Sequence, residues 1–425
     1  MNKTLKQGSR GPYVEYLQNI LNKLGLGAGA VDGSFGNRTE QAVIRFQKDI
    51  ELVPDGIVGP LTWQALDPYL KGFIRYIIKA GDMYYNLSRQ FNTSINALIA
   101  ANPSLNTENL QVGQEMVIPF IRSTIPTDIS YCYEIMQLNI ASLKVHFPFL
   151  EVGVVGRSVL GNDITYIKIG TGPKEVFYNA AHHANEWITS VVLMKYIEQF
   201  SNAYVNGEKI GGSDSIQIYN ETTTYIIPMV NPDGVNLVAG CYEEGSPEYR
   251  RALLLNVPSI PFPSGWTANI KGVDLNLNYP AGWDRAKAQK FALGYTSPRP
   301  FGYVGPAPLS EPESRAIVEF TRSHNFSLTL AYHSQGEIIF WKYLNYLPPH
   351  SLQIAYELSS VSGYAVEETP IESGYAGYKD WFIQEYNRPG YTIEVGIGVN
   401  PLPITQFSEI YKDNIGILTQ VALLS

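Results

Sequence analysis

A histidine and a glutamate lie three residues apart in the segment 181–189, which reads Ala-His-His-Ala-Asn-Glu-Trp-Ile-Thr. The apolar run 176–181 leads into this segment and is typical of a buried strand, and a helical pattern over 188–200 follows it. His183 and Glu186 are therefore expected at a strand-to-helix turn, at the carboxyl end of a strand, where open α/β sheets form ligand crevices. Both side chains can point at one metal ion there, although the spacing is not that of the His-Glu-x-x-His helix motif.

Three further strand-like runs, at residues 224–230, 328–332 and 390–395, carry polar residues at or near their ends. His333 directly follows the second run, and Glu394 lies inside the third. Taken alone, His333 is explained by burial in the core, and Glu394 by an ion pair with a buried lysine or arginine.

Taken with His183 and Glu186, His333 completes a set of two histidines and one glutamate, a known catalytic zinc set whose fourth position is open to water. Zinc lowers the pKa of such a water to about 7 and polarises a bound carbonyl. Hydrolysis also needs a carboxylate close to the water, as general base and later proton carrier, and Glu394 suits that role. The sequence therefore predicts a hydrolytic zinc centre.

The composition limits the other possibilities. A chain of 425 residues is too long for one ordinary core, so two or more domains are expected. The net charge of −8 is spread without long runs, which disfavours nucleic acid as a partner. The first residues do not resemble a signal peptide, and no apolar run is long enough to span a membrane. Cys132 and Cys241 allow one bridge, but two inert thiols are the favoured expectation.

The organisation along the chain predicts three domains of different kinds. Residues 129–425 alternate strand-like and helical runs, which predicts a large α/β domain with a buried mixed sheet. Residues 1–70 contain two copies of an Asp-Gly-x-x-Gly turn, at 32–36 and 55–59, each followed by a helical run. This small three-helix pattern resembles the peptidoglycan-binding domain of many cell-wall hydrolases. A helical spacer without a ligand is the alternative.

Residues 73–120 predict the order strand, helix, helix, strand, and residues 121–128 read as a linker. The pattern resembles a LysM domain over its full length, except that Met83 stands where that family usually has threonine or serine. The resemblance implies binding of N-acetylglucosamine-containing glycans by two loops; the alternative is a degenerate domain that only packs on its neighbours. The implied glycan-binding residues are Gly81, Asp82, Met83, Tyr84, Asn102, Pro103, Ser104 and Leu105.

Five motifs in the last domain occur in the order and approximate spacing of the zinc carboxypeptidase family. They are the segments 183–189, 231–234, 272–278, 333–334 and 392–394. The resemblance implies an eight-stranded sheet with helices on both faces, one zinc ion per chain on His183, Glu186 and His333, and Glu394 as general base. It also implies that Asp274 accepts a hydrogen bond from the ring of His183.

The departures from the family pattern bear on the substrate. The family holds the C-terminal carboxylate of its substrate with an asparagine and an arginine; here Asn276 remains, but Leu277 stands at the arginine position. Asn185 replaces a second arginine of the cleft. Leucine offers no donor to a carboxylate, so the two changes argue against removal of C-terminal residues and favour a substrate that continues past the cleaved bond.

Three further roles are expectations from the same resemblance. Lys271 is the candidate for stabilising the oxyanion. Tyr375, preferred over Tyr378, is the candidate for the mobile tyrosine of the family. Lys379 is expected to recognise a substrate carboxylate, with a solvated surface lysine as the equal alternative.

Together the three domains resemble bacterial γ-D-glutamyl-meso-diaminopimelate endopeptidases. We therefore expect zinc-dependent cleavage of the γ-D-glutamyl–diamino acid amide of peptidoglycan stem peptides. The alternatives are a metallocarboxypeptidase and, in another class, an inactive wall-binding adaptor. The expected partners are glycan strands and stem peptides, without nucleic acid or membrane, and the chain is expected to be a monomer. Its expected place is the cell wall or the exterior, including the sporulating cell or spore. The preferred diamino acid, its amidation and the route to the wall stay open.

Overall fold

The computed structural model describes residues 3–120, 123–371 and 374–424. The chain divides into two compact units: Met1–Ser130 with Glu134–Leu150, and Tyr131–Tyr133 with Glu151–Ser425. Within the described ranges, no helix combines the length and the apolar character that a membrane crossing requires.

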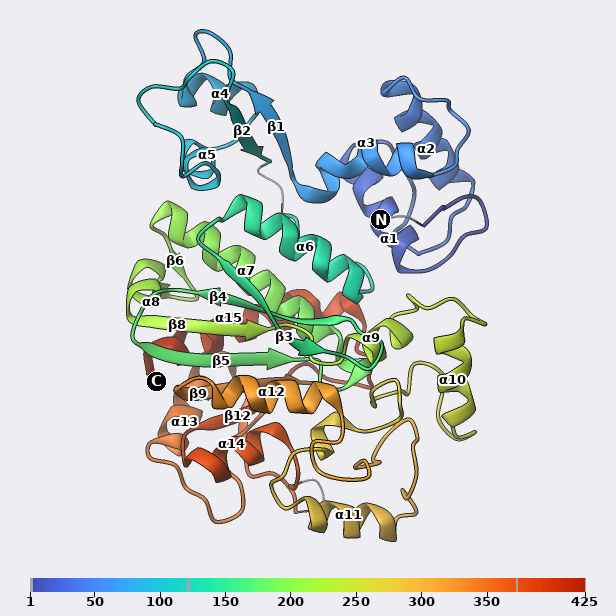
Figure 1. Ribbon diagram of the computed structural model, residues 1–425, viewed down its shortest axis with the longest axis vertical. Coiled ribbons are helices and arrows are strands. Elements are labelled where there is room, and N and C mark those ends of the chain that lie inside the picture. The colour runs from blue at the N-terminus through green and yellow to red at the C-terminus, as the bar shows by residue number, and fades with distance from the viewer. Residues whose placement is uncertain (1–2, 121–122, 372–373, 425) are drawn as a thin grey trace. The chain divides into compact units, whose positions relative to one another are not determined.

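Three helices form the N-terminal segment, namely α1 (Pro12–Lys23), α2 (Asn37–Asp49) and α3 (Pro60–Lys71) (Figure 1). The two Asp-Gly turns are each held by a glutamine. Gln18 Nε2 donates to Asp32 Oδ1 at 3.0 Å, and Gln18 Oε1 accepts from the amide of the following glycine at 3.0 Å. Gln47 makes the equivalent contacts with Asp55 and its glycine, both at 2.9 Å. The internal repeat is therefore one turn built twice, with equivalent hydrogen bonds.

The next segment has the predicted order of strand, helix, helix and strand. Its elements are β1 (Phe73–Ile77), α4 (Tyr84–Gln90), α5 (Ile95–Ala101) and β2 (Glu115–Pro119). The two strands pair antiparallel, and Ser94 caps α5 by accepting from Ala97 N at 3.0 Å. Helix α6 (Tyr133–His146) lies mostly in this first unit, where His146 Nε2 is 2.9 Å from Gly72 O. Of the expected linker 121–128, residues 121–122 lie outside the described residues, and 123–128 contain no helix or strand.

Two of the residues predicted to bind glycan have structural roles. Tyr84 is buried in the small core of this segment, and Asn102 is 7% exposed. The Asn102 side chain donates to Leu98 O and Val117 O, both at 2.7 Å, and accepts from Val117 N at 2.8 Å, which ties α5 to β2. Met83 is 57% exposed, and the short loop after Asn102 is exposed at Pro103 and Ser104. The glycan-binding assignments remain predictions.

The second unit contains the predicted mixed sheet of eight strands, which lie in the order β11-β10-β12-β9-β5-β8-β4-β3. Figure 1 labels β3, β4, β5, β8, β9 and β12 of this sheet. The neighbours β12, β9, β5 and β8 run parallel, and strands on both sides of them run antiparallel. The strands are β3 (Glu151–Arg157), β4 (Asp163–Ile169), β5 (Lys174–Ala180), β8 (Thr222–Ile227), β9 (Phe326–His333), β10 (Ile338–Phe340), β11 (Ala365–Glu367) and β12 (Gly390–Glu394). A separate hairpin pairs β6 (Lys209–Ile210) with β7 (Ser213–Asp214).

Helices cover both faces of this sheet, as alternate residues of β5 show. Phe177 packs against Phe320 of α12 (Pro312–Arg322) and Tyr378 of α14 (Tyr378–Tyr386), whereas the hydroxyl of Tyr178 donates to Leu418 O of α15 (Phe407–Leu424) at 2.9 Å. Successive strand residues point to opposite faces, so the two layers of helices lie on opposite sides. The helices of this unit are α7 (Ile188–Asn206), α8 (Ser215–Glu221), α9 (Pro232–Val238), α10 (Pro247–Leu255), α11 (Trp283–Ala292), α12 (Pro312–Arg322), α13 (Ser351–Ser362), α14 (Tyr378–Tyr386) and α15 (Phe407–Leu424), with short 3₁₀ turns η1 (Ala184–Glu186), η2 (Leu275–Leu277) and η3 (Ile404–Gln406).

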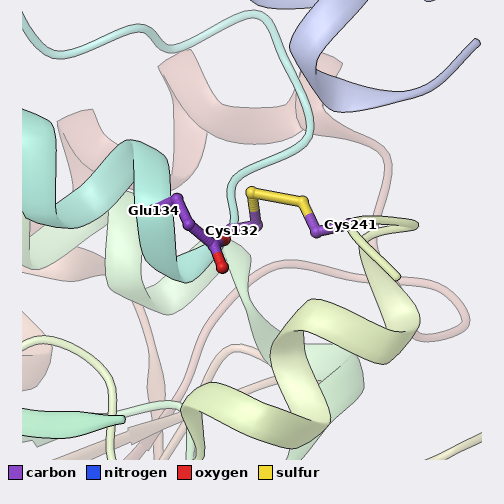
Figure 2. Close-up of side chains that lie close together, drawn as sticks. All are labelled: Cys132, Glu134 and Cys241. Atoms are coloured by element: carbon purple, nitrogen blue, oxygen red, sulfur yellow. A yellow bond between two sulfur atoms is a disulfide. The ribbon is translucent and has the colours of Figure 1, made fainter. Parts of the chain in front are cut away.

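Cys132 and Cys241 form a disulfide, so the expectation of two inert thiols was wrong. The bridge joins the segment 131–133 to the loop that follows α9, and both partners belong to the second unit (Figure 2). The two cysteines are 109 positions apart, so the sequence does not reveal their pairing. A stable disulfide is typical of proteins in an oxidising compartment, which agrees with the expected place outside the cytosol.

Candidate metal centre and substrate cavity

The turn that carries His183 and Glu186 is fixed by its own backbone. Strand β5 ends at Ala180, and Ala181 takes a left-handed conformation with φ 52 that reverses the chain before η1. The hydroxyl of Thr189, in the first turn of α7, donates to Glu186 O at 2.7 Å and accepts from Ala181 N at 3.1 Å. These bonds hold the start of the helix against the end of the strand, so both functional side chains lie at this edge of the sheet.

His333 and Glu394 reach the same edge from the neighbouring strands. His333 is the last residue of β9 and Glu394 the last residue of β12, and the two are register partners in the parallel pair. Strand β9 also lies next to β5. Because the carboxyl ends of parallel strands meet at one edge, the sheet brings His183, His333 and Glu394 together, although 211 positions separate the first from the last.

The three predicted metal ligands converge. Ligand atoms of His183, Glu186 and His333 all lie within 4.8 Å of one another. The two oxygens of Glu186 lie 2.9 Å from His183 Nδ1 and 2.9 Å from His333 Nδ1. His183 Nε2 lies 3.2 Å from Asp274 Oδ1, and the other oxygen of Asp274 accepts from Gly302 N at 3.1 Å. Asp274 thus fixes the ring of His183 with Nδ1 facing the other ligands.

The electrostatics of this cluster suit a cation. Burial disfavours the charged imidazole, but the carboxylates of Glu186 and Asp274 outweigh burial and raise the pKa of His183 well above its ordinary value. Burial acts to raise the pKa of Glu186, and the charges of His183 and His333 nevertheless bring it down to about 2. Two carboxylates around one imidazole therefore favour positive charge between them, and imidazole nitrogen with carboxylate oxygen is a donor set that zinc accepts. The residues fit the implied metal.

Glu394 lies beside the ligand cluster but is not one of the three converging ligands. Its side chain is half-buried, and burial followed by the negative charge of Glu186 raises the pKa of Glu394 well above its ordinary value, against a lowering effect of His183. A carboxylate whose proton affinity is raised is a better base than an exposed one. Its place beside the ligand cluster is the place that a general base would need.

Glu394 also lines a cavity in front of the ligands. The residues around it come from the strand ends, from the segment 274–277, and from helices α11 and α14. They are His183, Asp274, Asn276, Leu277, Lys290, His333, Phe340, Thr369, Gly377, Lys379, Asp380, Thr392 and Glu394. The cavity therefore joins two of the predicted metal ligands, His183 and His333, to a wall that contains two lysines.

Lys379 lines this cavity as the sequence predicted, but its charge is already paired. Its ammonium donates to Asp380 Oδ1 at 2.5 Å and to Lys342 O at 2.8 Å, and both side chains of the ion pair are 4% exposed. A buried pair of this kind is a structural element of the cavity wall.

The Lys379→Met variant is expected to lose about 3–5 kcal/mol of folding stability, because Asp380 would remain buried without its counter-charge. The double variant Lys379→Met/Asp380→Asn is expected to recover most of that loss. Thermal unfolding by calorimetry, compared across the three proteins, measures it. Equal melting temperatures for the wild type and the single variant would show that the ion pair does not contribute this much to folding stability.

The remaining predicted residues lie in different surroundings. Asn276 and Leu277 line the cavity. Asn185 is 6% exposed, does not line the cavity, and its amide oxygen is buried without a partner among the described residues. Lys271 lies 3.7 Å from Glu311 with its side chain 42% exposed, outside the cavity wall.

Neither candidate tyrosine lines the cavity. Tyr375 is 7% exposed and packs in the core, with the guanidinium of Arg285 5.8 Å from its ring. Tyr378 is fully buried, and its hydroxyl lies 3.2 Å from Thr321 Oγ1. Neither position explains the role expected for the mobile tyrosine of the family.

Two residues at the site were not predicted from the sequence. His182 is fully buried, and its Nε2 lies 2.8 Å from the hydroxyl of Tyr279. Burial lowers the pKa of His182 well below its ordinary value, so this ring is neutral. Lys290 of α11 lines the cavity. Burial acts to raise the pKa of Asp274, but His183, the Gly302 amide and, to a smaller extent, the charge of Lys290 lower it. Nothing in the local sequence of α11 distinguishes Lys290 from an ordinary surface lysine.

Three family models match the chain. The model described as Zinc carboxypeptidase matches residues 140–416, that of a peptidoglycan binding domain residues 10–66, and that of the LysM domain residues 76–119. The two small domains indicate binding to peptidoglycan and association with the cell wall.

The chain is similar to curated relatives and to solved structures. It is 40% identical over 395 residues to gamma-D-glutamyl-L-diamino acid endopeptidase 1 of Lysinibacillus sphaericus, an alignment that covers 80% of this chain and 98% of that protein. It is 26% identical over 261 residues to carboxypeptidase B of Rattus norvegicus, with 57% of each chain covered. The structure of bovine thrombin-activatable fibrinolysis inhibitor matches with a TM-score of 0.54 at 16% identity, over 70% of this chain and 98% of that one, which supports the fold.

Proposed function

The chain belongs to the zinc carboxypeptidase family of metallopeptidases, and from that premise we propose that it cleaves the amide between γ-D-glutamate and the diamino acid of peptidoglycan stem peptides. One zinc ion per chain would be held by His183, Glu186 and His333, with Asp274 behind His183. The name of the Lysinibacillus relative describes the same reaction, and that relative aligns over nearly its whole length.

The observation that carries the proposal is the apolar side chain of Leu277 in the cavity wall. The arginine fork that binds a terminal carboxylate in carboxypeptidases has no counterpart at this position, and Asn185 offers no charge either. A substrate whose C-terminal residue directly follows the cleaved bond would leave its terminal carboxylate without that arginine partner. A stem peptide that continues beyond the bond does not have this requirement, so the wall favours endopeptidase action.

The residues of the site have separate tasks. Bound zinc would polarise the scissile carbonyl and acidify a water. Glu394 takes the proton of the attacking water and passes it to the nitrogen of the leaving diamino acid. Asp274 keeps His183 in the tautomer with a free Nδ1, because it accepts the hydrogen bond of Nε2. The parallel strands bring His333, Glu394 and the turn that carries His183 and Glu186 to one edge of the sheet, so little rearrangement is needed before reaction.

The two N-terminal domains supply the location. Binding to an insoluble polymer raises the effective concentration of its peptide stems around a tethered catalytic domain, without any new contact to the stem itself. The proposed glycan contacts are those of the LysM loops around Gly81, Met83, Pro103 and Ser104, the exposed members of the predicted set.

The test is incubation of the protein with purified muropeptides, with and without a zinc chelator, and identification of the products by mass. A chelator-sensitive fragment that begins at the diamino acid supports the proposal. Stepwise loss of single C-terminal residues would establish a carboxypeptidase in its place. Absence of turnover, together with sedimentation on purified cell walls, would establish a wall-binding adaptor.

A further inference from the structure

The cavity wall contains two lysines, and they differ in what surrounds their ammonium groups. Lys379 is 4% exposed and paired with Asp380, so its charge is neutralised and two of its three donors are used. Lys290 is half-buried, and it has neither an ion-pair partner within 4.0 Å nor a side-chain hydrogen bond in the part of the chain that the structure describes. Lys290 is therefore the wall lysine whose ammonium has no direct ion pair, although its charge also acts on Asp274 across the cavity.

The helix that carries Lys290 supports this reading. Lys290 lies in the last turn of α11, and the same helix has a second lysine one turn earlier. The ammonium of that residue, Lys287, lies 5.0 Å from the ring centre of Trp283 and 5.3 Å from that of Phe291, and it does not line the cavity. The two lysines thus separate into one that covers aromatic rings and one that faces the substrate space.

Asn276 offers a second donor in the same wall. Its amide oxygen accepts from Tyr378 N at 3.0 Å, at the start of α14. This bond fixes the amide, and its NH₂ group has no hydrogen-bond partner among the residues that the structure describes. An amide NH₂ and an ammonium that line one cavity are suitable donors for the two oxygens of a carboxylate.

We propose that Lys290, with Asn276, binds a substrate carboxylate that flanks the scissile amide, and that Lys290 so replaces the cationic group absent at Leu277. This inference rests on the proposed function, since the γ-linkage leaves the α-carboxylate of glutamate free, and the diamino acid has a second free carboxylate next to the bond when it ends the peptide. An ammonium is a point charge without the fixed fork of a guanidinium, so it accepts a carboxylate in the middle of a chain as well as one at its end.

The experiment compares the acid peptide L-Ala-γ-D-Glu-diaminopimelate with two forms of it. One is amidated at the glutamate α-carboxylate, and the other at the diamino acid carboxylate next to the scissile bond. The Lys290→Met variant is expected to lose about 10- to 100-fold in kcat/KM on the acid peptide, the range for a hydrogen bond to a charged group. It is expected to lose little on one amidated peptide, which identifies the carboxylate. Lys290→Arg should recover part of the loss, and Lys287→Met is the matched control.

Three results would overturn the inference: an unchanged kcat/KM for Lys290→Met on the acid peptide, an equal loss on all three peptides, or a wild type without preference for the acid. Failure of the proposed function is a different result, in which the wild type leaves the γ-glutamyl amide intact. In that case, calorimetry can still compare the affinity of the same three peptides for the Glu394→Gln variant with and without Lys290→Met, which tests the carboxylate contact without turnover.

Discussion

Replacement of Glu394 by glutamine is expected to lower kcat on stem peptides by about 10²- to 10⁴-fold, the usual contribution of a general base. The glutamine amide has nearly the same shape as the carboxylate, but it cannot take a proton from the attacking water. Glu394 does not belong to the three residues that converge as metal ligands, so the variant should bind as much zinc as the wild type. Turnover of a defined peptide and metal content by mass spectrometry measure the two effects.

The matched control is Glu367→Gln, which changes an exposed glutamate of β11 in the same sheet. It should leave both kcat and metal content unchanged. An active Glu394→Gln enzyme would remove Glu394 from the role of base. An inactive variant that has also lost its metal would instead place Glu394 among the groups that hold the site together.

Replacement of His333 by alanine is expected to remove the metal and the activity together. Loss of a group that merely orients a metal ligand costs about 10- to 100-fold in affinity or activity, so loss of a ligand itself should cost at least as much. The buried oxygen of Glu186 that faces His333 would also lose its partner at 2.9 Å. Zinc titration followed by calorimetry, and peptide turnover at saturating zinc, check the two expectations.

The control for this variant is His350→Asn. His350 is an exposed histidine outside the cavity, with φ 59, a conformation that asparagine tolerates well. Chelation of the wild type should reproduce the His333→Ala phenotype, and added zinc should reverse chelation but not the substitution. Wild-type zinc affinity in His333→Ala would exclude His333 as a ligand.

The metal cluster was predictable because each of its parts has a local signal. Apolar runs ending in His, Glu or Asn mark the carboxyl ends of buried strands, and the parallel strands β5, β9 and β12 bring those ends to one edge of the sheet. His183 and Glu186 needed only the strand-to-helix pattern. His333 and Glu394 were found from their places at strand ends and from the family resemblance, whereas the adjacency of their strands comes from the structure.

The charged wall of the cavity was not predictable in the same way. Lys290 lies on a helix with a polar exposed face, where a lysine that lines a cavity and one that meets solvent have the same sequence context. Lys271 was preferred because it precedes Asp274 closely, yet its side chain lies near Glu311 and not in the cavity. Adjacency to a motif in sequence fixes the position of the backbone, whereas side-chain direction depends on tertiary packing.

Register partnership between His333 and Glu394 has a consequence for how this scaffold changes over time. Neighbouring strands lie about 4.8 Å apart in every sheet, so the backbone hydrogen bonds of the sheet fix the spacing between the ligand His333 and the base Glu394. The lysines of the wall come from α11 and α14, which do not contribute to that spacing. Substrate preference can therefore change at half-buried wall positions of α11 such as Lys290 while the spacing of ligand and base stays constant, whereas the buried Lys379–Asp380 pair of α14 must be kept for folding.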